Sequence, residues 1–220
     1  MENKVDFFEQ LRKLPTSCIS DALDMLGING GCELIRPLTQ GMALVGPAFT
    51  LQYEQVKEGE KAPAGEFIDE VPAGSVVVIA NGGRYCTVWG DLLTIAAKQK
   101  GIKGTVIDGC CRDATSIIQM NYPIFTKGTY MKSGKNRVKL VGKQIPVRIG
   151  NTIVHPGDVI CADDSGVIVI PQEVLPEVVE KALAVEIMEQ QIIRDLREGI
   201  SMKDARERHN YNNFALLLNK

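Results

Sequence analysis

The stretch that most constrains the fold of this chain runs from Trp89 to Asp113. An apolar helix pattern that starts near Asp91 ends at a glycine, and a short apolar strand, 105–107, follows before the pair Arg112-Asp113. This order is typical of the alternating helices and strands of open α/β sheets. In such sheets the start of a helix and the carboxyl end of the adjacent strand share the side on which small ligands bind. The pattern therefore predicts that Asp91 and Arg112-Asp113 meet, although twenty residues separate them.

The length and composition indicate one globular α/β domain. A chain of 220 residues with 45% hydrophobic and 24% charged residues is ordinary for a soluble protein, and no linker divides it. We expect a core domain over residues 1–171, which carries the active site. A long amphipathic helix pattern then opens a C-terminal helical extension over residues 172–220, which we expect to pack on a neighbouring subunit.

Charge and targeting signals favour a cytoplasmic protein with a small-molecule ligand. The net charge is only −2, which gives no general attraction to nucleic acid or membranes. The charged N-terminus lacks the apolar core of a signal peptide, and no apolar run approaches the length of a membrane span. The stretch 114–157 holds seven basic and no acidic residues. It is either a positive rim that attracts carboxylates or an ordinary solvated hairpin face.

The scarcity of histidine limits the kind of metal site that the chain can build. The two histidines, His155 and His209, cannot form the histidine-rich motifs of zinc enzymes. The six cysteines show no C-x-x-C spacing, so we expect reduced, buried thiols. A bound metal would have oxygen ligands, which favours Mg²⁺ or Mn²⁺.

The residues around the helix start and the strand end suit an anionic substrate held on such a metal. Arg112 offers a planar, permanently charged group for a carboxylate. Asp113 is the candidate metal ligand, and Asp91 is placed to hold a metal-bound water. The backbone amides of Gly90, Asp91, Leu92 and Leu93 are further candidates for substrate binding. Alternatively, Arg112 and Asp113 form a structural ion pair with Asp113 as a helix cap, and Asp91 is a first-turn acid favoured by the helix dipole.

These motifs resemble those of the 4-hydroxy-4-methyl-2-oxoglutarate aldolases, which share their fold with the regulator of ribonuclease activity A. The resemblance is carried by GDLL at 90–93, by G-x-x-x-D-G-x-x-R-D at 104–113, by LPTSCISDAL at 14–23 and by HPGDVICADDSGVIVIP at 155–171. It implies an α/β, layered β/β/α swivelling-domain-like fold with a C-terminal helical extension.

The resemblance also implies a function and an assembly. The expected activity is that of a class II pyruvate aldolase, a carbon–carbon lyase that cleaves a 4-hydroxy-2-oxo acid to pyruvate and a second oxo compound. Oxaloacetate decarboxylase activity should accompany it. In the family the arginine binds the pyruvoyl carboxylate, the following aspartate binds the metal and the GDLL loop contacts substrate. A homotrimer or hexamer is expected, in which Glu186 or Glu189 of the C-terminal helix approaches a neighbour's metal.

Two other functions remain possible from the sequence. One is a non-catalytic protein that binds and regulates a ribonuclease, which Asp91 argues against. The other is a class I aldolase with a Schiff-base lysine, for which Lys98, Lys100 and Lys103 are the nearby candidates.

Overall fold

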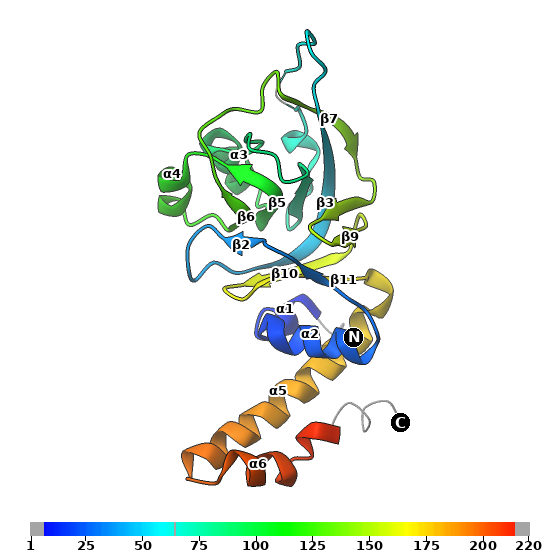
Figure 1. Cartoon of the computed structure of the whole chain (residues 1–220), viewed down its shortest axis with the longest axis vertical. Coiled ribbons are helices and arrows are strands. Elements are labelled where there is room, and N and C mark those ends of the chain that lie inside the picture. Colours follow the sequence, from blue (N-terminus) through cyan, green and yellow to red (C-terminus); the bar gives the residue numbers. More distant parts are fainter. Residues whose placement is uncertain (1–6, 64, 214–220) are drawn as a thin grey trace, which may run out of the picture. The chain divides into compact units, whose positions relative to one another are not determined.

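The computed structural model describes residues 7–63 and 65–213, and these divide into two compact units (Figure 1). One unit comprises Gly30–Gln172, and the other joins the chain up to Asn29 with the chain from Glu173 onward. The sequence predicts a core over residues 1–171, whereas the larger compact unit spans Gly30–Gln172. The N-terminal helices, however, group with the C-terminal extension instead of the core, because they pack against its long helix.

The larger unit is built on a nine-stranded mixed sheet in the order β1-β11-β10-β3-β4-β5-β6-β2, with β7 also paired to β3. A separate hairpin consists of β8 and β9. The bounds are β1 (Gly31–Cys32), β2 (Arg36–Pro37), β3 (Leu44–Gln55), β4 (Val76–Ala80), β5 (Gly104–Cys111), β6 (Ile124–Thr129), β7 (Val138–Lys143), β8 (Val147–Ile149), β9 (Thr152–Val154), β10 (Val159–Asp163) and β11 (Gly166–Ile170).

Strand β3 connects the two parts of the sheet. Its first residues pair antiparallel with β10, and from Ala48 onward it pairs in parallel with β4 and antiparallel with β7. The sequence suggests an interruption at Gly46-Pro47, but the strand continues through them. Gly46 is required there because a Cβ would lie 2.6 Å from the carbonyl oxygen of Gly74. The close approach of two backbones thus explains this glycine.

Two apolar layers cover the two faces of the sheet. On one face, side chains of β4 and β5 pack with helices α3 (Asp91–Gln99) and α4 (Ala114–Gln119), through Ala97 and Ile117. On the other face, side chains of the same strands pack with β8, β9, β10 and β11. This arrangement is the layered β/β/α fold that the sequence analysis expects.

The parallel strands β4, β5 and β6 bring their carboxyl ends to one edge. The loop after β4 leads directly into α3, and Arg112 follows immediately after the end of β5. A short 3-10 helix, η1 (Ile68–Glu70), precedes β4. The fold therefore places the start of α3 and the end of β5 together, as the helix-and-strand order predicts.

The smaller unit is entirely helical in its described part. Its long helix α5 (Leu175–Arg197) follows the short 3-10 helix η2 (Gln172–Val174) and packs on α1 (Phe7–Leu11), α2 (Thr16–Met25) and α6 (Met202–Arg208), and η3 (Tyr211–Asn213) follows α6. Met188 and Ile192 of α5 form an apolar cluster with Ala205 of α6. Among the described residues, none of the helices combines the length and apolar character needed to cross a membrane.

Candidate active site

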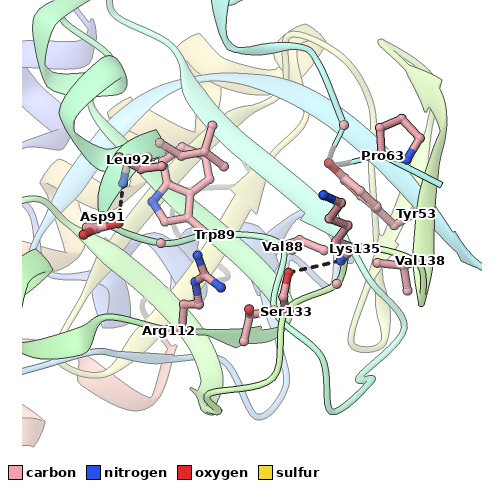
Figure 2. Close-up of a pocket in the computed structure, with 15 residues that line it drawn as sticks. Tyr53, Pro63, Val88, Trp89, Asp91, Leu92, Arg112, Ser133, Lys135 and Val138 are labelled. Carbon is pink, nitrogen blue, oxygen red and sulfur yellow. Dashed lines mark hydrogen bonds between the residues drawn. The ribbon is translucent and has the colours of Figure 1, made fainter. Parts of the chain in front are cut away.

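A pocket of about 270 Å³ opens where the loop after β4 meets the end of β5 (Figure 2). Its described lining comes from five separate segments of the larger unit: Tyr53; Pro63 and Gly65; Thr87, Val88, Trp89, Gly90, Asp91, Leu92 and Leu93; Arg112; and Ser133, Gly134, Lys135 and Val138. The residues that the sequence predicts to bind substrate, Gly90, Asp91, Leu92, Leu93 and Arg112, all lie in this lining. Asp113 does not line the pocket but contacts two residues that do.

Buried Trp89 fixes the turn that leads into α3. Its ring stacks on Tyr122 with a centroid distance of 5.9 Å, and its Nε1 donates to Thr94 Oγ1 at 2.8 Å. The Thr94 hydroxyl in turn donates to the carbonyl oxygen of Gly90 at 2.9 Å. These contacts hold the backbone of Gly90 and Asp91 in one conformation before any ligand binds.

Two hydrogen bonds join the start of α3 to the end of β5. The Arg112 amide donates to the Trp89 carbonyl oxygen at 3.0 Å, and the Asp91 amide donates to Asp113 Oδ2 at 3.2 Å. The structure thus brings together Asp91, Arg112 and Asp113, the three residues that the spacing predicts to meet.

Arg112 is compatible with both roles considered from the sequence, a structural ion pair and the binding of a substrate carboxylate. Its Nε lies 3.3 Å from Asp113 Oδ2, so the ion pair considered from the sequence does form. The pair uses only Nε, and the two terminal amino groups have no partner among the described residues. Figure 2 shows the guanidinium group directed towards the pocket below Trp89. Those terminal groups are the ones that a carboxylate would engage.

The conformation of Asp113 argues against the helix-cap interpretation. The residue occupies the N-cap position of α4, yet its side chain makes no capping hydrogen bond. Its backbone is left-handed, with φ of 57°, a conformation that costs a residue other than glycine about 1 kcal/mol or more. The side chain turns back towards Gly90, where any Cβ would lie 2.5 Å from Oδ2. Gly90 therefore leaves the space that the Asp113 carboxylate occupies.

Asp91 reduces the number of backbone amides open to substrate. Its Oδ1 accepts a hydrogen bond from the Leu92 amide at 2.7 Å, while its own amide is bound by Asp113. Two of the four amides predicted to bind substrate are therefore satisfied within the protein. The amides of Gly90 and Leu93 have no partner in the described part of the chain and keep the predicted role.

The carboxylate oxygens left over fit an oxygen-preferring divalent ion. Asp113 Oδ1 and Asp91 Oδ2 have no partner among the described residues, and both groups are partly exposed. Because no histidine or cysteine belongs to this set, its donor chemistry suits Mg²⁺ or Mn²⁺ better than zinc.

Several lining residues could not be assigned to the site from the sequence. Tyr53 and Val138 lie on β3 and at the start of β7, which come together only through sheet pairing. Burial raises the pKa of the Tyr53 phenol, so this side chain lines the pocket as a neutral group. Pro63 and Gly65 belong to the polar loop 57–65, whose composition does suggest a border of the site. Lys135 comes from the basic stretch that follows Asp113.

The lysines considered for a Schiff base lie elsewhere. Lys98 donates to the carbonyl oxygen of Met120, and Lys100 donates to that of Asp69 at 2.9 Å. Neither these two nor the exposed Lys103 lines the pocket. Lys135 is the one lysine among the described lining residues.

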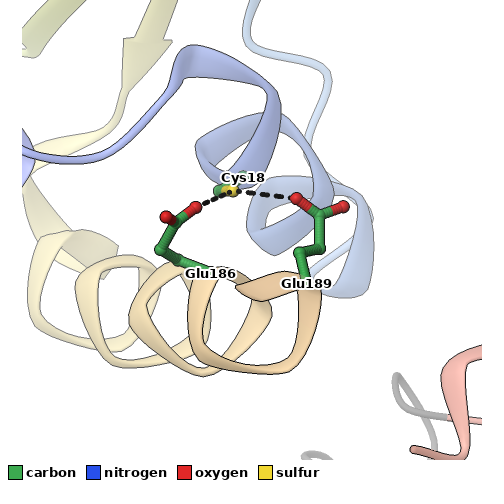
Figure 3. A group of neighbouring side chains, drawn as sticks. All are labelled: Cys18, Glu186 and Glu189. Carbon is green, nitrogen blue, oxygen red and sulfur yellow. Dashed lines mark hydrogen bonds between the residues drawn. The ribbon is translucent and has the colours of Figure 1, made fainter. Parts of the chain in front are cut away.

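The carboxylates of Glu186 and Glu189 lie within the smaller unit, on either side of Cys18 (Figure 3). The Cys18 thiol lies 3.3 Å from Glu186 Oε2 and 3.7 Å from Glu189 Oε2. Burial, reinforced by the hydrogen bond to Glu186, raises the pKa of Cys18 to about 12. The thiol is therefore protonated at neutral pH and serves as a hydrogen-bond donor between α2 and α5.

Comparison with known proteins identifies the family. The model of the family described as RraA-like, Aldolase/RraA, matches residues 16–169. The chain belongs to the RraA-like family. The match includes the whole of the candidate site, from Tyr53 to Val138.

Individual RraA-like relatives differ in length and in name. Protein DlpA of Legionella pneumophila is 46% identical over 218 residues, which cover 98% of this chain but only 35% of that protein. A protein of Halalkalibacterium halodurans, provisionally named a 4-hydroxy-4-methyl-2-oxoglutarate aldolase, is 37% identical over 81% of this chain and 83% of its own length. The crystal structure of Streptomyces coelicolor RraAS2, described as an unusual member of the RNase ES inhibitor RraA family, matches with a TM-score of 0.81. Its identity is 28%, over 88% of this chain and 98% of that one.

We expect Asp113→Asn to separate metal binding from folding in this RraA-like protein. Asparagine tolerates the left-handed backbone, and its amide oxygen can still accept from the Asp91 amide, so the free energy of unfolding should change by less than about 0.5 kcal/mol. Loss of the charge should weaken Mg²⁺ binding by at least about tenfold. Urea unfolding and titration calorimetry measure the two effects.

Asp164→Asn is the matched control, because the Asp164 carboxylate also accepts one backbone hydrogen bond, from Gly41 at 2.8 Å. It should leave Mg²⁺ binding unchanged. If Asp113→Asn lowers the free energy of unfolding by several kcal/mol while the protein that remains folded keeps its Mg²⁺ affinity, Asp113 has a structural role.

Proposed function

We propose that this protein is a divalent-metal-dependent aldolase that cleaves a 4-hydroxy-2-oxo acid, such as 4-hydroxy-4-methyl-2-oxoglutarate, to pyruvate and a second oxo compound. The observation that carries the proposal is the Asp113 carboxylate, which is held in a strained backbone conformation without capping its helix, beside an arginine with free terminal groups. The relative with a provisional aldolase name supports the same class of reaction.

The side chains of the pocket have separate tasks in this reaction. Arg112 binds the carboxylate of the pyruvoyl part with its two terminal amino groups, and the free Leu93 amide is available to the same group. Asp113 would hold Mg²⁺ or Mn²⁺ directly, and Asp91 would hold a water molecule bound to that ion. The metal ion, when bound, supplies Lewis-acid stabilisation of the negative charge that develops on the keto oxygen.

The bond changes follow from the chemistry of a 4-hydroxy-2-oxo acid. The C4 hydroxyl loses its proton, the C3–C4 bond breaks, and C4 becomes the carbonyl carbon of the second product. The electron pair of that bond moves into the C2–C3 unit, and a proton added at C3 completes the pyruvate methyl group. Oxaloacetate decarboxylation breaks the corresponding C3–C4 bond and releases carbon dioxide, so we expect it as an accompanying activity.

We further propose that the active form is a homotrimer or hexamer, as the sequence resemblance implies. Large apolar side chains on the larger unit support an assembly, because Tyr85 and Met131 are each 77% exposed and Leu92 is 75% exposed. Exposed apolar groups of this size are common at contacts between protein chains.

The second candidate function is that of a ribonuclease regulator without catalytic activity. The specific observation in its favour is the similarity to RraAS2, whose description names the RNase ES inhibitor family. Against it stands the presence of Asp91 beside Arg112 and Asp113, since a protein that only binds a partner has no need of this set.

Release of pyruvate tests the proposed function directly. We expect the protein to release pyruvate from 4-hydroxy-4-methyl-2-oxoglutarate, to lose this activity in EDTA and to regain it with Mg²⁺ or Mn²⁺. A coupled lactate dehydrogenase assay measures the product. Activity that survives EDTA, with a lysine adduct trapped by borohydride, would assign the protein to the Schiff-base class.

Arg112→Lys should lower kcat/KM by an amount equivalent to about 2–4 kcal/mol, because lysine keeps the charge but cannot make two parallel hydrogen bonds to a carboxylate. Arg148→Lys is the control, since Arg148 lies on β8 and donates to the carbonyl oxygen of Asn151. A folded Arg112→Lys protein with normal kcat/KM would restrict Arg112 to its ion pair with Asp113.

A further inference from the structure

The basic residues of the stretch 114–157 differ in what they contact. Three of the seven pair with carboxylates, two donate to carbonyl oxygens, and two have side chains without a partner in the described part of the chain. The pairs are Lys127 with Asp108, Lys139 with Glu60 and Lys143 with Glu70; the donors to carbonyl groups are Arg137 and Arg148; the remaining two are Lys132 and Lys135. Of these seven, Lys135 alone lines the pocket.

The turn that carries Lys135 is held firmly against the pocket wall. The Gly134 amide donates to the Thr87 carbonyl oxygen at 2.8 Å, and the Lys135 amide donates to Ser133 Oγ at 3.2 Å. A Cβ on Gly134 would lie 2.7 Å from that same Thr87 oxygen, so the turn approaches the wall as closely as a backbone can. The position of the Lys135 backbone is therefore fixed, although its side chain is exposed.

The backbone register relates Lys135 to Arg112. Thr87 forms parallel bridges to Cys110 on one side and to Ser133 on the other. Neighbouring strands lie about 4.8 Å apart, so the backbones of Cys110 and Ser133 are separated by roughly 10 Å. Arg112 and Lys135 each follow two residues later in the same direction. The two cations therefore lie on two sides of one pocket, as Figure 2 shows.

The wall near Lys135 is apolar. Tyr53, Val88 and Val138 line it, and Asp91 is the one carboxylate among the described lining residues. An anionic group at this end of a ligand would find Lys135 as its partner, and the carbon atoms between the two ends would contact apolar side chains.

We propose that Lys135 binds a second carboxylate of the substrate and so restricts the site to 2-oxo diacids with five or six carbons in the main chain. This inference rests on the proposed function, since it assumes that Arg112 holds the 2-oxo carboxylate. Lys135 is a specificity residue: it contacts the end of the substrate that leaves as the second oxo product.

A matched pair of substrates tests this role. 4-Hydroxy-4-methyl-2-oxoglutarate and 4-hydroxy-4-methyl-2-oxopentanoate differ only in a carboxylate against a methyl group. Lys135→Ala should lower the ratio of kcat/KM for the diacid to that for the monoacid by about 10- to 100-fold, the usual effect of losing a hydrogen bond to a charged group. Lys135→Arg should restore most of the ratio, which a Schiff-base role would not allow. Lys132→Ala, which removes the other unpaired lysine, should leave the ratio unchanged.

Equilibrium binding separates this inference from the proposed function. 2-Oxoglutarate and 2-oxopentanoate form a second matched pair that lacks the 4-hydroxyl group, so calorimetry with Mg²⁺ measures recognition without cleavage. A preference for 2-oxoglutarate that Lys135→Ala abolishes supports the inference even if no substrate releases pyruvate. An unchanged preference in Lys135→Ala, or a wild-type protein that binds both acids equally, overturns it.

Discussion

The candidate site depends on two hydrogen bonds that join the start of α3 to the end of β5. One runs from the Arg112 amide to the Trp89 carbonyl oxygen and the other from the Asp91 amide to Asp113 Oδ2. Neither would bring functional side chains together unless β4 and β5 were parallel neighbours, which places both carboxyl ends at one edge. Stacking of Trp89 on Tyr122 then fixes the turn that leads into α3. The apolar core and the chemistry of the site thus share one segment of backbone.

The same segment contains the clearest conflict between folding and function. Asp113 adopts a left-handed backbone and leaves its helix uncapped, while its carboxylate faces a glycine that leaves just enough space for it. Strained residues of this kind cluster at functional sites because the surrounding structure supplies the stability that they cost. The ion pair with Arg112 is compatible with this account, since it engages Nε and leaves the terminal groups available.

Much of this could be predicted from local sequence patterns. The helix from Asp91, the strand before Arg112 and their glycine boundaries all follow from periodicity and stop signals, and their order places the two ends together. The pocket wall could not be predicted, because Tyr53 and Val138 meet only through the pairing of β3 with β7, which no local pattern specifies. The hydrogen bonds that the Asp91 and Leu92 amides donate to Asp113 and Asp91 could not be predicted either, since they depend on side-chain rotamers. The sequence shows Lys135 only as one of the seven basic residues of the stretch 114–157, and no local pattern assigns it to the pocket.

We propose that Arg112, Asp113 and the start of α3 form a site that stabilises the enolate of pyruvate. Exchange of the pyruvate methyl protons for deuterium, followed by proton NMR, tests it most directly, because exchange needs neither the natural substrate nor C–C cleavage. We predict exchange in D₂O with Mg²⁺ that is lost in EDTA and in Asp113→Asn. Wild-type protein that binds Mg²⁺ and pyruvate without any exchange above the buffer rate would contradict the claim.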